Sequence, residues 1–531
     1  MRGRLGKIAG AVQAAVLLAC AAMAQPPAAH RHAFVQVTVA DSVPGPVSGR
    51  MLIFLQKAGA QKAEEVDVSE FHPADTAVAA QEVSDLKPGS SVEVDLDRSA
   101  FPEPFSSLLR GDYELQAVLD TDHTYNYSGR GPQDWQSGVV EAKGWEPGAG
   151  DEPTLTLTRH PAPGPRAAMY AKTMSEVKPG EEEKAEMESP ALTAFWGRPI
   201  FVRAWVILPP GYEAHGKRRY PTMYWTHGFG GDINYALAMG LRLRQAMVER
   251  KAPPMICVML DESIPQGTHE FADSVNDGPW NTALTKEFIP WLEAKYHMDA
   301  RRNGRFLNGH SSGGWATLQL EVNDPQVFGG TWSTSPDPSD FHNFTGPDLY
   351  AAHANVYHEP NGTLWPIMRD KGKVQATMEQ FAGLETVLGP YGGQISSFDW
   401  VFSPKSASGA PEPMFDRVTG DVNPAVVKYW GEHYDLANVA ERNWAKNGEL
   451  LKGRVHLYVG TADTFYLDGA ARLFEARLKK LGADPRFTYI PGRTHFDLYF
   501  IGDDHMGLMW QIMDQMYAVA RPGTKWKMQK P

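Results

Sequence analysis

The chain has 531 residues, of which 42% are hydrophobic, 21% are charged and 11% are aromatic, and it contains only two cysteines. This hydrophobic content excludes a disordered polymer, and two cysteines cannot form a disulfide framework. A mean hydropathy of −0.38 argues against a polytopic membrane protein. The formal net charge of −12 argues against broad nucleic-acid binding, which needs a dense positive surface. We therefore expect a folded protein of several domains, and the oligomeric state stays open.

Residues 1–24 have the three parts of a secretory signal peptide. Three basic residues precede an apolar stretch over residues 8–24, and a small-x-small pattern allows cleavage after Ala24. The stretch is at the short limit for a bilayer span, so we expect no membrane span in the mature chain. Residues 17–20 resemble a bacterial lipobox, which leaves a lipid anchor at Cys20 as an alternative. The protein is expected to be periplasmic or secreted, and lipidation at Cys20 would instead make it a lipoprotein.

Residues 32–160 consist of short strand-like runs that are separated by Pro, Gly, Asp and Ser. This pattern predicts a small, antiparallel, sandwich-like all-β domain. The strands are predicted at residues 34–39, 51–55, 91–96, 113–119 and 154–157. Residues 161–188 are rich in Pro and Gly and then in charge, so they are predicted to form a linker.

From residue 189 to residue 521 strand-like runs alternate with amphipathic helices. This alternation predicts an α/β domain with a mostly parallel sheet and helices on both faces. The predicted strands are 201–208, 222–226, 255–260, 305–308, 328–333, 455–459 and 487–490, and the predicted helices are 237–250, 282–296, 467–481, 505–520 and one that begins near Ser311. The alternation breaks at residues 335–451, which predicts a cap insertion. Cys257 falls within a buried strand and is expected to be an inert thiol.

Ser311 is the candidate nucleophile. It is the centre of the chain's one G-x-S-x-G pattern, Gly309 to Gly313, between a predicted strand and a predicted helix. A serine on such a sharp turn projects its hydroxyl above the sheet, and the glycines remove side chains that would collide with the neighbouring backbone. A glycine-rich turn without catalysis is the alternative, and the strand-to-helix context favours the nucleophile.

The candidate base and acid follow the last two predicted strands. His495 would take the proton of Ser311, and a carboxylate at Asp463 would orient the imidazole and stabilise its charged form. Asp468 is a competitor for the acid, but it lies at the start of a predicted helix, where a negative charge is favourable. The chain order Ser311, Asp463, His495 is that of α/β-hydrolases.

The glycine-rich segment after strand 222–226 is the candidate oxyanion loop. Acyl transfer needs backbone N–H donors at the oxygen that becomes negative. We expect the amide of Ser312 as one donor and the amide of Phe229 as the other, with Gly230 as the alternative. A segment with possible metal ligands begins at His269, but its spacing matches no zinc site, so neither a metal nor another cofactor is expected.

Four segments together resemble the putative esterase family of α/β-hydrolases. They are residues 206–212, 220–231, 309–314 and 328–338, with Asp463 and His495 following. This family includes esterase D, enterochelin-esterase-like enzymes, feruloyl esterases and antigen 85-type acyltransferases. The resemblance covers residues 189–520 and not the N-terminal domain. It implies a serine hydrolase of carboxylic esters.

The sequence therefore predicts an exported serine carboxylic ester hydrolase that forms an acyl-enzyme. Its substrate would be a small-molecule or carbohydrate-linked ester, such as a feruloyl or acetyl ester, or a siderophore ester. An acyltransferase on the same fold is one alternative, and a non-catalytic carbohydrate-binding or adhesion protein is another. The N-terminal domain could bind carbohydrate, cover the mouth of the active site or mediate dimerisation.

Overall fold

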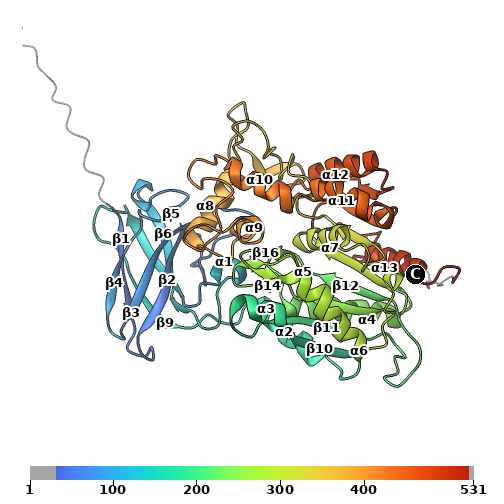
Figure 1. Ribbon diagram of the computed structural model, residues 1–531. Helices are drawn as coiled ribbons and strands as arrows, with labels where there is room; N and C mark the ends of the chain where they lie inside the picture. Colours follow the sequence, from blue (N-terminus) through green and yellow to red (C-terminus); the bar gives the residue numbers. More distant parts are fainter. Residues whose placement is uncertain (1–31, 525–531) are drawn as a thin grey trace, which may run out of the picture.

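The computed structural model describes residues 32–524, which form two large β-sheets in succession along the chain (Figure 1). The predicted export signal at residues 1–24, with Cys20, lies outside the described residues. Among residues 32–524 no helix is both long and apolar enough to cross a bilayer.

The first sheet has nine strands in the order β4-β1-β9-β7-β6-β2-β3-β5, with β8 paired to β6 outside this path. Strands β1 and β9 are parallel, and β1 and β4 are antiparallel, as are β2, β3 and β6. The elements are β1 (Phe34–Val39), β2 (Val47–Lys57), β3 (Ala77–Leu86), β4 (Ser91–Asp95), β5 (Ala100–Phe101), β6 (Gly111–Asp120), α1 (Tyr125–Ser128), β7 (Trp135–Ser137), β8 (Val140–Trp145) and β9 (Thr154–Arg159).

The strands of the predicted sandwich-like domain form one continuous sheet that curls on itself. Strands β3 and β4 are far apart in the strand order, yet they meet through side chains. Gln81 donates to the carbonyl of Glu93 at 3.3 Å and accepts from the amide of Asp95 at 3.1 Å. The all-β class agrees with the prediction. One pairing departs from the predicted antiparallel arrangement, because β9 lies parallel to β1. These strands come from the two ends of the segment, and local alternation cannot reveal their pairing.

Strand β2 is buried on both faces, which explains its continuous apolar run. Ile53 points into the core of the curled sheet, whereas Leu52 and Phe54 point to the opposite face. There they meet Leu384 and Val387 of α8 (Met378–Leu388), a helix that lies much later in the chain. The first sheet therefore shares a hydrophobic core with the predicted insertion.

The predicted linker at residues 161–188 contains a helix and a strand. Helix α2 (Pro165–Ser175) packs against α4 (Ile233–Val248), and β10 (Glu182–Glu188) pairs with β11 (Phe201–Ile207) over its whole length. The charges that suggested a linker belong to an edge strand, in which Ala185 and Glu182 are buried and Glu182 lies 3.4 Å from Arg244. The second sheet therefore begins before residue 189.

The second sheet has eight strands in the order β10-β11-β13-β12-β18-β19-β22-β23. Strand β11 runs antiparallel to both neighbours, and all pairs from β13 to β23 are parallel. This is the strand order of the α/β-hydrolase fold, and it confirms the predicted fold class. The strands are β11 (Phe201–Ile207), β12 (Thr222–Thr226), β13 (Ile256–Leu260), β18 (Arg305–His310), β19 (Thr331–Thr334), β22 (Val455–Gly460) and β23 (Arg486–Ile490).

Helices cover both faces of this sheet (Figure 1). Alternate residues of β12 show the division, because Met223 packs under α4 and α13 while Tyr224 packs on the opposite face. Cys257 is fully buried in β13, and burial raises the pKa of its thiol to about 12. The helical elements are α3 (Pro190–Trp196), α4 (Ile233–Val248), α5 (Trp280–Thr282), a π-helical turn (Ala283–Phe288), α6 (Ile289–Lys295), α7 (Ser312–Asn323), α12 (Asp468–Leu481) and α13 (Gly507–Ala520).

The segment predicted as an insertion, residues 335–451, follows β19 and contains many packed aromatic side chains, which share a core with Trp315 of α7. Phe402 packs edge-on against Trp430 at 5.2 Å, and Phe341 packs on Phe344 at 5.7 Å. Its last helix, α11, packs on α7 and α12 and so belongs to the layer that covers the sheet. The elements are β20 (Pro366–Asp370), β21 (Lys373–Thr377), α8, α9 (Gln394–Phe402), α10 (Pro424–His433) and α11 (Leu436–Leu451).

Candidate active site

Ser311 occupies a strained turn between β18 and α7. Its backbone has φ of 60° and ψ of −125°, outside the regions that L-residues normally adopt. The flanking glycines permit the turn. A Cβ on Gly309 would lie 2.1 Å from the carbonyl oxygen of Gly313, and one on Gly313 would lie 2.2 Å from that of His227. The G-x-S-x-G pattern is therefore a nucleophile elbow in the structure.

The predicted base and acid are in direct contact. Nδ1 of His495 lies 3.0 Å from Oδ2 of Asp463, and both side chains are buried. The other carboxylate oxygen accepts the amide of Phe465 at 3.0 Å, which fixes the orientation of Asp463. Because an ionised carboxylate only accepts hydrogen bonds, Nδ1 of His495 carries the proton and Nε2 is free to accept one. This is the tautomer that a general base requires.

The carboxyl of Asp463 stays ionised at neutral pH. Burial raises its pKa, but the nearby His495 imidazole and the Phe465 amide outweigh burial, so the pKa lies below its ordinary value near 3.8. The competing acid, Asp468, begins α12 and lies 3.5 Å from Arg369, which also donates to the backbone carbonyl of Asp463. Asp468 is thus engaged at a helix start, as its position in the sequence indicated.

His495 stands beside the elbow. Its ring centroid lies 4.4 Å from that of His310, the residue before Ser311. Within residues 32–524 no hydrogen bond joins the Ser311 hydroxyl to His495. Rotation about the Cα–Cβ bond of Ser311 redirects this hydroxyl, and bonds of this kind commonly tighten when substrate binds.

Asp337 is a residue of the site that the sequence did not identify. Its Oδ2 accepts the hydroxyl of Ser312 at 2.7 Å, and its amide donates to the carbonyl of Ser311 at 3.3 Å. Burial raises the pKa of the Asp337 carboxyl to about 6, although the bond from Ser312 and the charge of His495 lower it. The signal was available, since Asp337 follows the end of β19 at the same sheet edge as Ser311 and Asp463.

The predicted oxyanion loop lies against the nucleophile. A Cβ on Gly228 would be 2.9 Å from the Cβ of Ser311, so only glycine allows this approach. Within residues 32–524 the amides of Phe229 and Ser312 donate no hydrogen bond. Free amides beside the serine are what an oxyanion hole requires, and which of them serves stays a prediction.

His227 fixes the direction of the Phe229 amide. Its Nδ1 lies 2.9 Å from the carbonyl oxygen of Gly228, and its Nε2 lies 3.2 Å from Oδ1 of Asp261. Because a peptide unit is planar, the Gly228 carbonyl and the Phe229 N–H point in opposite directions. By holding that carbonyl, the fully buried His227 holds the Phe229 amide toward the other side.

The possible metal ligands near His269 are not brought together. His269 stacks on Trp280 at 3.6 Å, whereas the exposed Asp273 accepts the Thr282 amide at 3.0 Å. Within residues 32–524, no group with metal-ligand spacing includes a residue of the triad or of the oxyanion loop.

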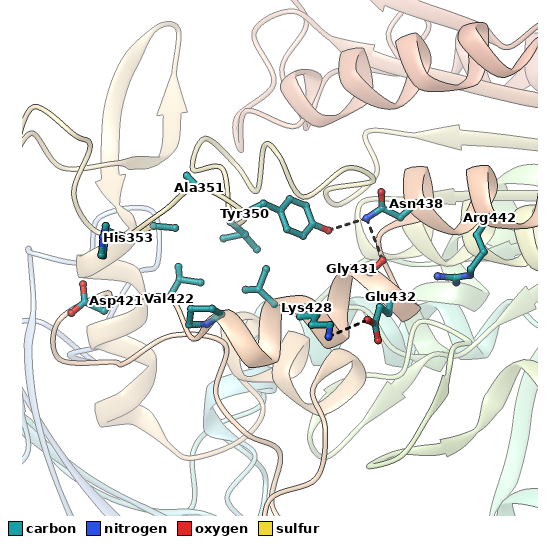
Figure 2. Close-up of a pocket in the computed structure, with 14 residues that line it drawn as sticks. Tyr350, Ala351, His353, Asp421, Val422, Lys428, Gly431, Glu432, Asn438 and Arg442 are labelled. Carbon is teal, nitrogen blue, oxygen red and sulfur yellow. Dashed lines mark hydrogen bonds and ion pairs between the residues drawn. The ribbon is translucent and has the colours of Figure 1, made fainter.

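A cavity of about 670 Å³ lies elsewhere, in the region of α10 and α11. Figure 2 shows this cavity with Tyr350, Asn438 and Arg442 on its wall. Tyr350 and Asn438 are already bonded to each other at 3.2 Å. None of the lining residues belongs to the triad or to the oxyanion loop, so this cavity is separate from the site around Ser311.

The eight-stranded sheet, the elbow at Ser311 and the pair of His495 and Asp463 define a serine ester hydrolase of the α/β-hydrolase class. Residues 200–485 match the family described as "Putative esterase", and the chain belongs to this family. The matched segment contains Ser311 and Asp463, and His495 follows it.

Two curated relatives are similar to part of the chain. They are Esterase MT1326 of Mycobacterium tuberculosis strain CDC 1551 / Oshkosh and Esterase Rv1288 of strain H37Rv. Each is 32% identical over 120 residues, which is 22% of this chain and 24% of the relative. The match thus spans about a quarter of either relative.

Two solved structures are also similar. A ferulic acid esterase has 14% sequence identity and a TM-score of 0.37, with 64% of this chain and 97% of that chain covered. S-formylglutathione hydrolase from Staphylococcus aureus has 14% identity and a TM-score of 0.38, with 64% and 98% covered.

Proposed function

We propose that this protein is an exported carboxylic ester hydrolase that uses Ser311 as its nucleophile and forms an acyl-enzyme. The observation that carries the proposal is the strained elbow of Ser311 beside the buried pair of His495 and Asp463. The free amides of Phe229 and Ser312 next to this elbow support it.

In the acylation step, Oγ of Ser311 attacks the carbonyl carbon of the ester while Nε2 of His495 takes the serine proton. The carbonyl oxygen becomes an oxyanion, which the amides of Phe229 and Ser312 stabilise. The bond from the carbonyl carbon to the alkoxy oxygen then breaks, and His495 returns its proton to the departing alcohol. The negative Asp463 stabilises the imidazolium between these two transfers.

In the deacylation step, water attacks the carbonyl carbon of the acyl-enzyme, and His495 takes one proton of the water. A second oxyanion forms at the same amides and collapses with cleavage of the bond to Ser311. The proton returns to Oγ of Ser311, and the carboxylic acid leaves. If an alcohol occupied the place of water, the same groups would transfer the acyl chain, so the ratio of acid to new ester measures the two outcomes.

Labelling with a fluorophosphonate probe tests the nucleophile. The full-length protein should be labelled at Ser311, and Ser311→Ala should abolish both labelling and hydrolysis of p-nitrophenyl acetate. Ser408→Ala, at an exposed serine in the insertion, is the matched control and should behave as wild type. Folded wild-type protein that is not labelled would refute the proposal. Feruloyl, acetyl and siderophore esters form the panel for the natural substrate.

Export is the second part of the proposal, and it rests on residues 1–24. The mass of the mature protein from its native host distinguishes cleavage after Ala24 from lipidation at Cys20. A chain that keeps residues 1–24 in the cytoplasm would contradict export without affecting the ester chemistry.

A further inference from the structure

Two segments of the first domain, residues 32–160, reach the candidate active site. One is α1, which lies between the two large sheets (Figure 1) and carries Tyr127. The other is the loop between β2 and β3, which carries Phe71. Each segment makes an aromatic contact with a residue next to the catalytic groups, Tyr127 with Phe229 and Phe71 with Phe496.

Helix α1 is held from both ends. Asp120 accepts the amides of Thr124 at 3.2 Å and Tyr125 at 3.1 Å, which fixes the start of the helix to strand β6. The buried side chain of Asn126 donates to the carbonyls of Glu385 at 3.1 Å and Gly389 at 3.2 Å, at the end of α8. The next residue, Tyr127, is therefore presented to the hydrolase domain from a fixed position.

Tyr127 contacts the oxyanion loop in two ways. Its hydroxyl donates to the carbonyl of Gly231 at 2.6 Å, and its ring packs edge-on against Phe229 with the centroids 5.0 Å apart. The Phe229 amide is the predicted oxyanion donor. Tyr127 therefore restrains the loop at Phe229 and Gly231, while His227 restrains it at Gly228.

Phe71 contacts the residue that follows the catalytic histidine. Its ring lies 5.7 Å from that of Phe496, and the Phe496 ring lies 5.4 Å from that of its neighbour His495. Phe71 is 40% exposed and Phe496 is 61% exposed, although both are large apolar side chains. Phe465 closes this side, with its ring 4.9 Å from His495. The two exposed rings form an apolar surface next to His495 that part of a substrate can cover.

We infer that the first domain is part of the catalytic centre, with Tyr127 as a positioning residue for the oxyanion loop and Phe71 as a specificity residue at its mouth. This inference rests on the proposed ester hydrolysis at Ser311. The substrate class is an ester with an apolar group that extends beyond the reacting carbonyl, between the two domains.

The two residues act at different stages of the reaction. The oxyanion exists only after attack by Ser311, so a loop that is held less firmly loses transition-state stabilisation and lowers kcat. Phe71 contacts a part of the substrate that does not react. Its loss therefore weakens binding equally in the ground state and the transition state, which raises KM and leaves kcat unchanged. The first effect is independent of substrate length, and the second grows with the apolar group.

Tyr127→Phe removes the bond to Gly231 and keeps the ring on Phe229. We expect kcat for p-nitrophenyl acetate to fall about tenfold, as for the loss of one hydrogen bond, with KM within about twofold. Tyr113→Phe is the matched control, because the Tyr113 hydroxyl donates to the Leu109 carbonyl at 2.5 Å within the first domain. This control should keep the wild-type kcat even if it lowers the melting temperature.

Phe71→Ala removes one of the exposed rings. We expect an unchanged KM for p-nitrophenyl acetate and a KM for p-nitrophenyl octanoate that rises about fivefold. Only the longer acyl chain reaches the Phe71 ring, so only this ester loses an apolar contact in the variant. Leu109→Ala, at a more exposed apolar side chain on another loop of the same domain, should leave both values unchanged.

The outcomes separate this inference from the proposed function. Wild-type kcat in Tyr127→Phe together with wild-type KM values in Phe71→Ala, in protein that is still labelled at Ser311, would overturn the inference alone. A loss of activity in Tyr127→Phe that only follows the unfolded fraction would also overturn the role of Tyr127. If folded wild-type protein is not labelled at all, the proposed function fails and the inference fails with it.

Discussion

His495 and Asp463 are joined across 3.0 Å although they follow different strands, β23 and β22. Those strands are parallel neighbours, so their carboxyl ends deliver the two side chains to one edge of the sheet. The contact leaves Nε2 of His495 as an acceptor beside Ser311, and the charge of Asp463 determines how readily this nitrogen accepts the serine proton.

Asp463→Asn tests the charge and not the shape of this contact. The amide can donate to Nδ1 and thereby favour the wrong tautomer, so kcat should fall by about 10³- to 10⁴-fold with little change in fold. Steady-state kinetics and the melting temperature measure the two effects. Asp468→Asn, at the start of α12, is the control and should keep most activity. Similar losses in the two variants would contradict the assignment of Asp463 as the acid.

Asp337 predicts a pH dependence of stability. Burial raises the pKa of its carboxyl from near 3.8 to about 6. Between these pH values the folded state keeps a proton that the unfolded state has released, so wild type loses stability as the pH rises through this window. In Asp337→Asn this loss is absent. The free energy of unfolding of the variant relative to wild type should therefore rise by about 2.5 kcal/mol between pH 3.8 and pH 7.

Urea denaturation at several pH values between 4 and 7 measures this difference. Asparagine can still accept the hydroxyl of Ser312, so the comparison isolates the charge. A difference between Asp337→Asn and wild type that does not change with pH would show that the carboxyl titrates at its ordinary value in the folded protein.

His227 predicts a contrast between two substitutions. The side-chain amide of His227→Asn can donate to the Gly228 carbonyl as Nδ1 of the imidazole does, whereas His227→Leu cannot. We expect kcat to fall about 100-fold in the leucine variant and clearly less in the asparagine variant, with similar KM values, because the Phe229 amide acts on the oxyanion. Equal losses in the two variants would argue against a role in orienting the loop.

The close packing around Gly309 predicts that one added methyl group, in Gly309→Ala, strongly affects stability and labelling. A Cβ there would lie 2.1 Å from the Gly313 carbonyl, which belongs to backbone that cannot move without shifting the elbow. Gly309→Ala should lower the free energy of unfolding by about 3 kcal/mol and abolish labelling of Ser311. Gly164→Ala is the control, because a Cβ at Gly164 has no atom within 4 Å. Normal labelling of Gly309→Ala would contradict the close packing of the turn.

The sequence was sufficient for the α/β class and for the contact between His495 and Asp463, because both depend on local patterns. Each parallel strand reads as an apolar run, and each polar residue of the pair follows such a run at the same sheet edge. The strain at Ser311 was also expected, since glycines at this spacing between a strand and a helix favour a sharp turn around the serine.

The features that the sequence did not reveal depend on distant contacts. Strand β10 carries acids because it is an edge strand, and acids at Glu182 and Glu183 suggested a linker. Asp337 reads as one more polar residue after a strand until its bond to Ser312 is seen. Tyr127 lies in a four-residue helix of another domain, and no local pattern relates it to Phe229.

The packing of α8 against β2 has a consequence for how the protein unfolds. Leu384 and Val387 are covered by Leu52 and Phe54, so neither domain can lose its structure without exposing apolar surface on the other. A chain cut at residue 189 would also lack β10, which leaves β11 as an open edge. Calorimetry of residues 32–524 should therefore show a single cooperative transition, in which the β-rich half and the hydrolase half melt together.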